Sequence, residues 1–427
     1  MSRATEEPAT EAAGPVGTTR RPWLPPAVWL LGGVSLLTDT ASEAIYPLLP
    51  IFLTQTLGAR PFALGLIEGV AEGTASLLKV MSGVLSDRSR KRRPWVRAGY
   101  GLSTLVRPLI GLAAAWPHVL FLRFADRVGK GVRGAPRDAI LAAAAPDDTR
   151  GRVFGFHRAM DHAGAVAGPL LATVFLWLAP GQYRTLFLLT IVPGLGVLAL
   201  LWRLPADRAD PVPAAARPAP STDGMAAPGE GGGWSRLPGR YYALLAVLLV
   251  FTLGNSSDAF LLLRLADLGV APAAIPLLWA LLHVVKATTS VAGGLAADRW
   301  GRRGVIVAGW LVYALVYAGF ARAYAALPAV GLFMAYGLYF GLTEGAEKAL
   351  VADFAPAALR GTAFGLYYGV LGVGALLASA VFGLLWERAG PHAAFALGSV
   401  LALVAAGCLL AVVPTGDRRT ASSGGLV

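Results

Sequence analysis

Stretches of about 20 apolar residues recur along the whole chain, and they limit the folds that it can adopt. A helix needs about 20 such residues to cross the hydrocarbon core of a bilayer. Only 15% of the 427 residues are charged, against about 25% in a soluble domain. The sequence therefore predicts an all-α membrane protein. Twelve apolar or amphipathic segments can be drawn, at residues 27–54, 61–85, 95–116, 117–143, 152–178, 184–204, 241–266, 273–297, 304–323, 326–353, 361–385 and 391–413.

Basic residues between these segments indicate the topology. Clusters lie at residues 88–93, 150–152 and 299–303, with Arg360 in a further loop, whereas the intervening loops contain only scattered arginines. Because basic loops stay in the cytoplasm, we expect twelve transmembrane helices with both termini cytoplasmic. The net charge of +12 follows from this topology, so we expect a lipid bilayer and no nucleic acid as partner.

Residues 205–240 are rich in proline, alanine and glycine and have no apolar pattern, which is typical of a flexible connector. We predict a disordered cytoplasmic tail at 1–25, a six-helix bundle at 26–204, this cytoplasmic linker at 205–240, a second six-helix bundle at 241–413, and a cytoplasmic tail at 414–427. The N-terminal stretch has no apolar core followed by a cleavage site, so no cleaved signal peptide is expected.

Several classes of function find no support in the sequence. The single cysteine, Cys408, excludes an intramolecular disulfide. His157, His162 and His283 are too scattered to predict a metal site. There is no phosphate-binding loop for ATP and no nucleophile–base constellation. We therefore expect no enzyme, no metal and no bound cofactor.

The two halves of the chain contain matching motifs. Gly83, Asp87 and Arg88 recur as Gly294, Asp298 and Arg299, about 210 residues later, and Arg150-Gly-x-x-Phe-Gly recurs at residues 360–365 at nearly the same offset. Repeated matches at one offset indicate duplication and fusion, with two pseudo-symmetric bundles related by a two-fold axis.

Residues 123–138 hold the densest charge within an apolar context. Seven of these sixteen residues are charged, and on a helix they fall within roughly 140° of arc. Such a stripe suits a helix that lines a polar cavity; an amphipathic helix on a surface is the alternative. The charged residues are Arg123, Asp126, Arg127, Lys130, Arg133, Arg137 and Asp138.

This stripe has too few acids of its own, because five cations stand against two carboxylates. Local pairs are expected from Asp126 to Arg123 and to Lys130, at spacings of three and four. Unpaired buried charge is costly, so other segments should supply further carboxylates. The candidates in the substrate and proton pathway outside the stripe are Asp39, Glu43, Glu68, Glu72, Arg107, Arg158, Asp161 and Glu344. A purely structural role for these pairs, including a local Glu344–Lys348 pair, is the alternative.

The motifs resemble those of the major facilitator superfamily. The run from Gly83 through Asp87 and Arg88 to residue 93 is similar to the family's loop motif G-x-x-x-D-R-x-G-x-R-R, with Arg90 where glycine is usual; the second copy keeps Gly301. The fourth segment has Arg123-x-x-Asp-Arg in place of R-x-x-Q-G and resembles a bacterial subgroup whose pattern does not identify a cargo.

The resemblance implies a multi-pass transporter of a bacterial inner membrane, a monomer that moves a small-molecule substrate by rocking two bundles. It implies that Asp87 and Asp298, with their neighbouring glycines and arginines, form a conformational latch; topology signalling is the alternative. Gly164, Gly168 and Pro169 are similar to the G-x-x-x-G-P motif of the family's exporters, although Leu170 and Leu171 follow it.

We therefore expect a secondary transporter that couples efflux of an anionic or zwitterionic solute or drug to the proton motive force, as an antiporter. Asp39, Glu43 and Asp126 are the candidate proton carriers, because a buried carboxylate beside a cation changes its charge with conformation. Two alternatives stay open: proton-symport uptake of an organic anion or metal chelate, and a transport-inactive sensor with the same fold.

Overall fold

The computed structural model describes residues 24–89, 92–144, 150–204, 237–354 and 360–413, and within these ranges all regular structure is helical. The expectation of an all-α chain is confirmed for this part. The first half contains α1 (Pro26–Ile45), α2 (Leu49–Ile51), α3 (Pro61–Ser89), α4 (Arg93–Leu109), α5 (Trp116–Ala144), α6 (Arg150–Leu178), α7 (Tyr183–Leu189) and α8 (Ile191–Trp202). The second half contains α9 (Gly239–Gly254), α10 (Ala259–Asp267), α11 (Ile275–Trp300), α12 (Arg302–Phe320), α13 (Ala326–Phe354) and α14 (Arg360–Val412).

Some helices are interrupted where the sequence requires it. The segment at 27–54 passes from α1 through a short 3₁₀ turn, α2 and a π turn at 52–56, since Pro47 and Pro50 each lack a backbone donor. Gly390, with φ 84° and ψ 169°, divides α14 into two helical parts. The motif glycine Gly301, between α11 and α12, has φ 89°, a conformation that side chains disfavour.

Seven stretches of the described chain are long and apolar enough to cross a membrane. They are Phe156–Leu178, Tyr183–Trp202, Gly239–Asp267, Pro272–Ala297, Arg302–Phe320, Ala326–Val351 and Ala363–Val412, the last of which includes the break at Gly390. The first four expected spans are not among them. Three of these segments carry buried charges, such as Glu68 on α3, Arg107 on α4 and Asp126 on α5. The count of twelve and the location of the termini stay predictions.

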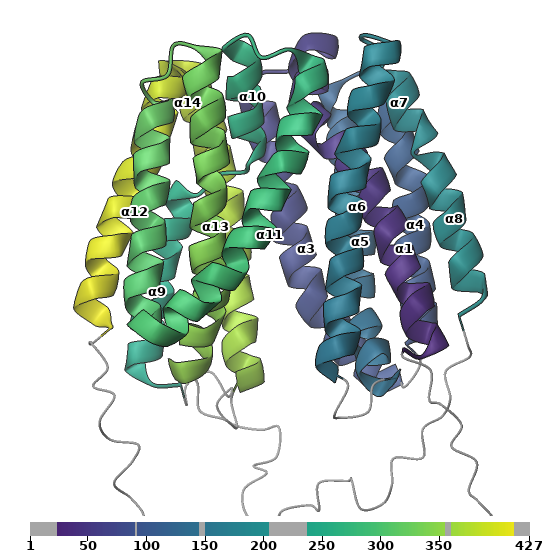
Figure 1. The fold of residues 1–427 in the computed structure, drawn as a ribbon, viewed down its shortest axis with the longest axis horizontal. Helices are drawn as coiled ribbons and strands as arrows, with labels where there is room; N and C mark the ends of the chain where they lie inside the picture. Colours follow the sequence, from purple (N-terminus) through teal and green to yellow (C-terminus); the bar gives the residue numbers. More distant parts are fainter. Residues whose placement is uncertain (1–23, 90–91, 145–149, 205–236, 355–359, 414–427) are drawn as a thin grey trace, which may run out of the picture.

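The helices form two groups that stand side by side, with α1 to α8 in one and α9 to α14 in the other (Figure 1). The same packing recurs in each: α1 lies on α6 as α9 lies on α14, and α3 and α4 lie on α5 as α11 and α12 lie on α13. Between the groups, α3 packs along α14 and α6 packs along α11. This repeated packing agrees with the duplication inferred from the motifs.

The contact between α3 and α14 is lined with glycine. A Cβ atom at Gly69 would lie 2.9 Å from the Leu376 carbonyl oxygen, and one at Gly372 would lie 2.8 Å from the Ser76 Cβ. Gly65 faces the Ser379 carbonyl even more closely. The two helices therefore meet largely backbone to backbone, as small residues allow in membrane helices.

The two groups have different interiors. The second is filled with aromatic side chains, in which Tyr313 stacks on Tyr317 with ring centroids 4.1 Å apart and Phe251 stacks on Trp310 at 4.5 Å. The first instead buries Arg107, Arg123 and Asp126, among other charged residues. Because buried charge is expensive unless it is paired, the first group is where a functional site is expected.

Candidate functional site

A cavity of about 460 Å³ lies on the inner side of the first helix group and reaches the second. Most of its wall comes from α1, α3, α5 and α6, whereas His283 of α11 and Tyr368 of α14 close it from the second group. Its charged lining residues are Asp39, Glu43, Glu72, Lys79, Lys130, Arg133, Arg137, Asp138, Arg158 and Asp161. The volume is in the range that holds a small organic molecule.

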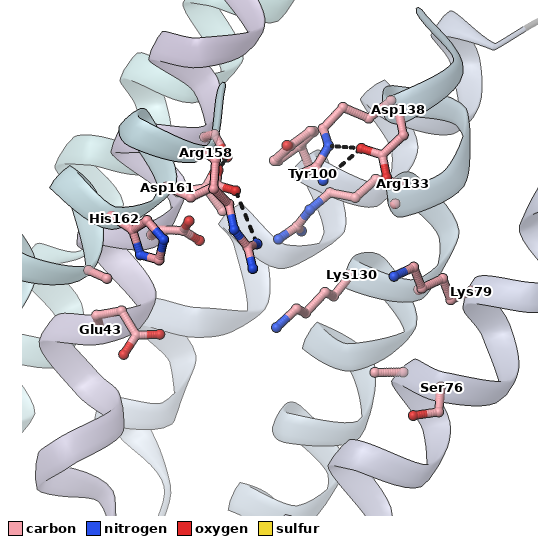
Figure 2. Close-up of a pocket in the computed structure, with 18 of the residues that line it drawn as sticks. Glu43, Ser76, Lys79, Tyr100, Lys130, Arg133, Asp138, Arg158, Asp161 and His162 are labelled. Atoms are coloured by element: carbon pink, nitrogen blue, oxygen red, sulfur yellow. Dashed lines mark hydrogen bonds and ion pairs between the residues drawn. The ribbon is translucent and has the colours of Figure 1, made fainter. Parts of the chain in front are cut away.

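Two lysines and two carboxylates face each other across the cavity. Figure 2 shows Lys130 and Lys79 on one side of the cavity and Glu43 and Asp161 on the other. Lys130 lies on α5 and Lys79 on α3, whereas Glu43 lies on α1 and Asp161 on α6. We call these sides the cationic wall and the acidic wall; Glu72 and Asp138 also lie on the helices of the first, and Arg158 on that of the second.

One face of α5 forms the cationic wall and continues into the protein as a buried network. Asp126 accepts a hydrogen bond from Nε of Arg107 on α4 at 2.9 Å, and Arg107 also donates to the Thr38 carbonyl at 2.8 Å. Both side chains of the ion pair are less than 10% exposed. Asp126 therefore pairs with Arg107 across the α4–α5 contact, and the expected pairs from Asp126 to Arg123 and Lys130 are wrong. Arg107 has no other carboxylate partner among the described residues.

Carboxylates of α3 neutralise the outer part of the stripe, as expected. Arg123 donates to Glu68 at 2.7 Å, with both side chains buried. Arg127 lies 3.9 Å from Glu72, whose side chain is half exposed. Of the residues in these ion pairs, Glu72 lines the cavity. The others lie beside the cavity without lining it: Glu68, Arg107, Arg123, Asp126 and Arg127.

Three cations of the wall have no carboxylate partner among the residues that the structure describes. Lys130 has neither an ion pair nor a hydrogen bond there, and Lys79 lies over the Tyr368 ring, 5.1 Å from its centroid. Arg133 donates to the Ser103 hydroxyl at 2.7 Å and lies over the Tyr100 ring at 4.2 Å. By contrast, Arg137 is paired with its neighbour Asp138.

The acidic wall is divided in the same way. Asp161 accepts a short hydrogen bond from Ser35 and lies 3.5 Å from His157 and 3.9 Å from Arg158. In the described part of the chain the Asp39 carboxylate has no such partner, and Glu43 accepts one bond, from Nε1 of Trp279 at 2.8 Å. Asp39 and Glu43 are therefore the uncommitted acids of the cavity.

Side chains of the two helix groups meet beside the cavity. In addition to the Glu43–Trp279 bond, the Tyr46 hydroxyl lies 3.3 Å from that of Ser257, which donates to Glu68 at 3.5 Å. Elsewhere Arg158 lies 3.4 Å from Glu344 of α13. Glu344 also pairs with Lys348 at 3.0 Å, which confirms the expected local pair. These bonds join the groups in this conformation.

The second group has one buried ion pair near the same contact. Lys286 lies 3.2 Å from Asp258, which also accepts a hydrogen bond from Tyr336 at 2.6 Å. Asp258 ends a non-helical stretch, residues 255–258, between α9 and α10. Non-helical backbone inside a membrane segment is tolerated where protein surrounds it or where it lines a cavity. The apolar segment expected at 241–266 thus corresponds to one candidate span, Gly239–Asp267, made of two helices with this break between them.

The exporter-type motif has a packing role in this structure. A Cβ atom at Gly164 would lie 2.5 Å from the Leu36 carbonyl oxygen, and one at Gly168 would lie 2.9 Å from the Ala44 nitrogen. The glycines thus let α6 approach α1 closely, and Pro169 lies within the same helix. This contact places Asp161 next to Ser35 on the acidic wall.

The expected latch falls partly outside the described residues. Gly83, Asp87 and Arg88 lie near the end of α3, and Asp298 lies near the end of α11, in stretches whose side chains the structure does not describe. Gly294 has open space where a Cβ would be, and Arg299 is exposed. The latch stays a prediction.

Several lining residues were not selected from the sequence. Lys79 is the clearest: a lysine inside an apolar segment is by itself a signal of function. Tyr100, His162 and Tyr368 also line the cavity, but nothing in their sequence surroundings separates them from packing residues. Among the described residues, no group of three or more His, Cys, Asp or Glu side chains is placed to hold a metal ion.

Comparisons with known proteins identify the family. The profile of the Major Facilitator Superfamily matches residues 31–266 and 243–426. The chain is 34% identical to an uncharacterised MFS-type transporter of Methanocaldococcus jannaschii, over 90% of this chain and 94% of that protein. It is 29% identical to the multidrug resistance protein MdtH of Photorhabdus laumondii, over 41% and 43% of the two chains.

The fold agrees with this assignment. A crystal structure of a mutant of the nucleoside transporter NupG superposes with a TM-score of 0.73 and 14% identity, over 91% of this chain and all of that one. Two repeated helix groups, apolar spans and a charged cavity beside their contact are the features of a membrane transporter. The chain belongs to the major facilitator superfamily, as a multi-pass membrane transporter of small molecules.

Proposed function

We propose that this protein is a proton-coupled antiporter that exports a small anionic or zwitterionic solute by alternating access. The observation that carries the proposal is the charged cavity of about 460 Å³, beside which the two helix groups are joined by side-chain bonds. A ligand in this cavity contacts both groups, so it can bias a rocking motion between them. The driving force is the proton motive force, with no bound cofactor, and the functional unit is a monomer in the bacterial cytoplasmic membrane.

The predicted topology gives the cavity a direction. With both termini in the cytoplasm, Tyr46 at the end of α1 and Ser257 after α9 lie toward the outer side of the membrane. Their contact closes the outer side, whereas the lining residues Lys79, Arg158 and His162 are exposed, which supports access to the cavity from the cytoplasm past the Arg158–Glu344 pair. An exporter loads its cargo in this state. The similarity to a multidrug resistance protein over part of the chain supports the same direction.

Asp39 is our choice for the proton carrier. It lines the cavity with no bonded partner among the described residues, so it can exchange a proton with the cavity as the cargo binds and leaves. Glu43, held by Trp279 of the other group, links this exchange to the contact between the groups. Asp126 was also a candidate, but its buried pair with Arg107 suits a structural role.

Inside-out membrane vesicles test this proposal. They are acidified by respiration, and a pH-sensitive dye reports whether an added solute releases protons from the lumen. We expect alkalinisation with a subset of zwitterions and organic anions, and its loss in Asp39→Asn. The matched control is Asp267→Asn, which makes the same change at an exposed carboxylate at the end of α10, away from the cavity lining. Solute movement into the vesicles without any proton movement would rule out antiport.

A further inference from the structure

The cavity contains charges of both signs that lack partners. Within the part of the chain that the structure describes, Lys130, Lys79 and Arg133 on one wall have no carboxylate partner, and Asp39 and Glu43 on the other have no cation within ion-pair distance. Every other charged lining residue is paired within the protein, in the bonds given above. A ligand is therefore the natural partner for these five side chains.

A solute with charge of only one sign matches this arrangement poorly. An anion would satisfy Lys130 and Arg133, but it would also approach Asp39 and Glu43 and leave them without a cation. A cation would pair with Asp39 and Glu43, but it would leave Lys130 and Arg133 without a carboxylate. Burial of a charge without a partner is unfavourable. Repulsion between a ligand and the wall of the same charge also weakens the binding of solutes that carry only one sign.

We infer that the cavity selects a zwitterion, whose ammonium group binds between Asp39 and Glu43 and whose anionic group binds between Lys130 and Arg133. This inference rests on the proposed transport function and names its substrate class. An ammonium group supplies hydrogen-bond donors to carboxylates, and a carboxylate or phosphonate accepts bonds from Lys and Arg. The two ends are read by different helices, α1 and α5.

The arrangement also couples the cargo to the proton. The carboxylates that would hold the ammonium group are the ones exposed to the cavity, so a proton and the cargo compete for the same oxygens. Binding of the cargo from the cytoplasm displaces a proton from Asp39, and release of the cargo outside lets a proton return. No oxidant or other reactant is needed, because only a proton and a ligand exchange places.

Matched ligand triplets in detergent test the inference. Each triplet has a zwitterion, its N-acetylated anion and its C-amidated cation, built on phenylalanine, phenylalanylalanine and 6-aminohexanoate. Calorimetry gives the Kd of each. We expect at least one zwitterion to bind at least about tenfold more tightly than both of its derivatives, since one lost charge-assisted bond is worth about that factor.

The variants assign the two ends. In Lys130→Gln the zwitterion should bind no better than the amide, whereas in Asp39→Asn with Glu43→Gln it should bind no better than the acetylated form. The Asp267→Asn control should keep the full preference. Equal weakening of all three forms in both variants, an anion that binds as tightly as the zwitterion, or no binding by any zwitterion would each overturn the inference.

The same measurements separate the two proposals. Proton-linked movement of solutes without a charge preference would remove the zwitterion assignment and leave the transporter intact. Selective binding of zwitterions without proton movement in vesicles would remove the antiport and leave the assignment of the cavity.

Discussion

Arg107 on α4 and Asp126 on α5 form a buried ion pair, with Nε and Oδ1 2.9 Å apart. The same guanidinium also donates to the Thr38 carbonyl of α1, so three helices meet at one side chain. The pair stands behind the cavity wall and holds α5 in the position that presents Lys130 and Arg133 to the cavity.

Replacement of Asp126 by asparagine should therefore destabilise the protein. Arg107 would keep its charge in a buried position without a carboxylate, a change that costs about 3–5 kcal/mol in buried pairs. Thermal unfolding of the purified protein in detergent measures the loss. Glu387→Gln is the control, because its 2.9 Å pair is with Arg60, whose side chain is 80% exposed, and exposed pairs contribute below about 1 kcal/mol. Equal melting temperatures for Asp126→Asn and the parent would show that the pair does not hold the helices.

A methyl group at Gly168 should loosen the contact between α6 and α1. Its Cβ would lie 2.9 Å from the Ala44 nitrogen and closer still to the Thr40 carbonyl, and forced overpacking typically costs about 1–3 kcal/mol. We expect Gly168→Ala to lower the melting temperature and the yield of monodisperse protein. Gly331→Ala on α13 is matched in chemistry but has nothing within 4 Å, so it should be neutral or slightly stabilising. An unchanged melting temperature and yield in Gly168→Ala would contradict the close approach of α6 to α1.

A cross-link between α1 and the stretch after α9 should block transport. Tyr46→Cys and Ser257→Cys are combined with Cys408→Ala, which removes the only native cysteine, and a protease site is placed in the 205–236 segment. Because the two hydroxyls lie 3.3 Å apart, a short, reducible bifunctional reagent should join the two fragments. Transport should stop and return on reduction. A cross-linked protein that still transports would mean that this contact does not open.

The helical segments were predictable from the sequence because apolar length and loop charge report directly on membrane insertion. The segment expected at 326–353 is α13 at Ala326–Phe354, and that expected at 152–178 is α6 at Arg150–Leu178. The break at 255–258 was missed, although the run Asn-Ser-Ser-Asp is a turn signal. Hydropathy averaged over a whole span hides four polar residues.

The candidate site was predictable only in part. The charged stripe identified the residues of one wall, because spacing along a helix fixes which side chains share a face. Their partners could not be found in this way: Arg107 reaches Asp126 from another helix, and Lys79 meets Tyr368 across the two groups. Such contacts depend on how helices pack against each other, and the spacing of residues within one segment contains no information on that.

The glycine-lined contact between α3 and α14 has a mechanical consequence. Where Gly65, Gly69 and Gly372 bring backbone against backbone, few side chains interdigitate. The two helices can therefore pivot without separating interlocked side chains. This contact can act as a pivot, in which α3 and α14 stay packed while the two groups tilt. The cost of switching between conformations would then be concentrated in the polar bonds around the cavity, which are the bonds that a proton or a cargo molecule can break.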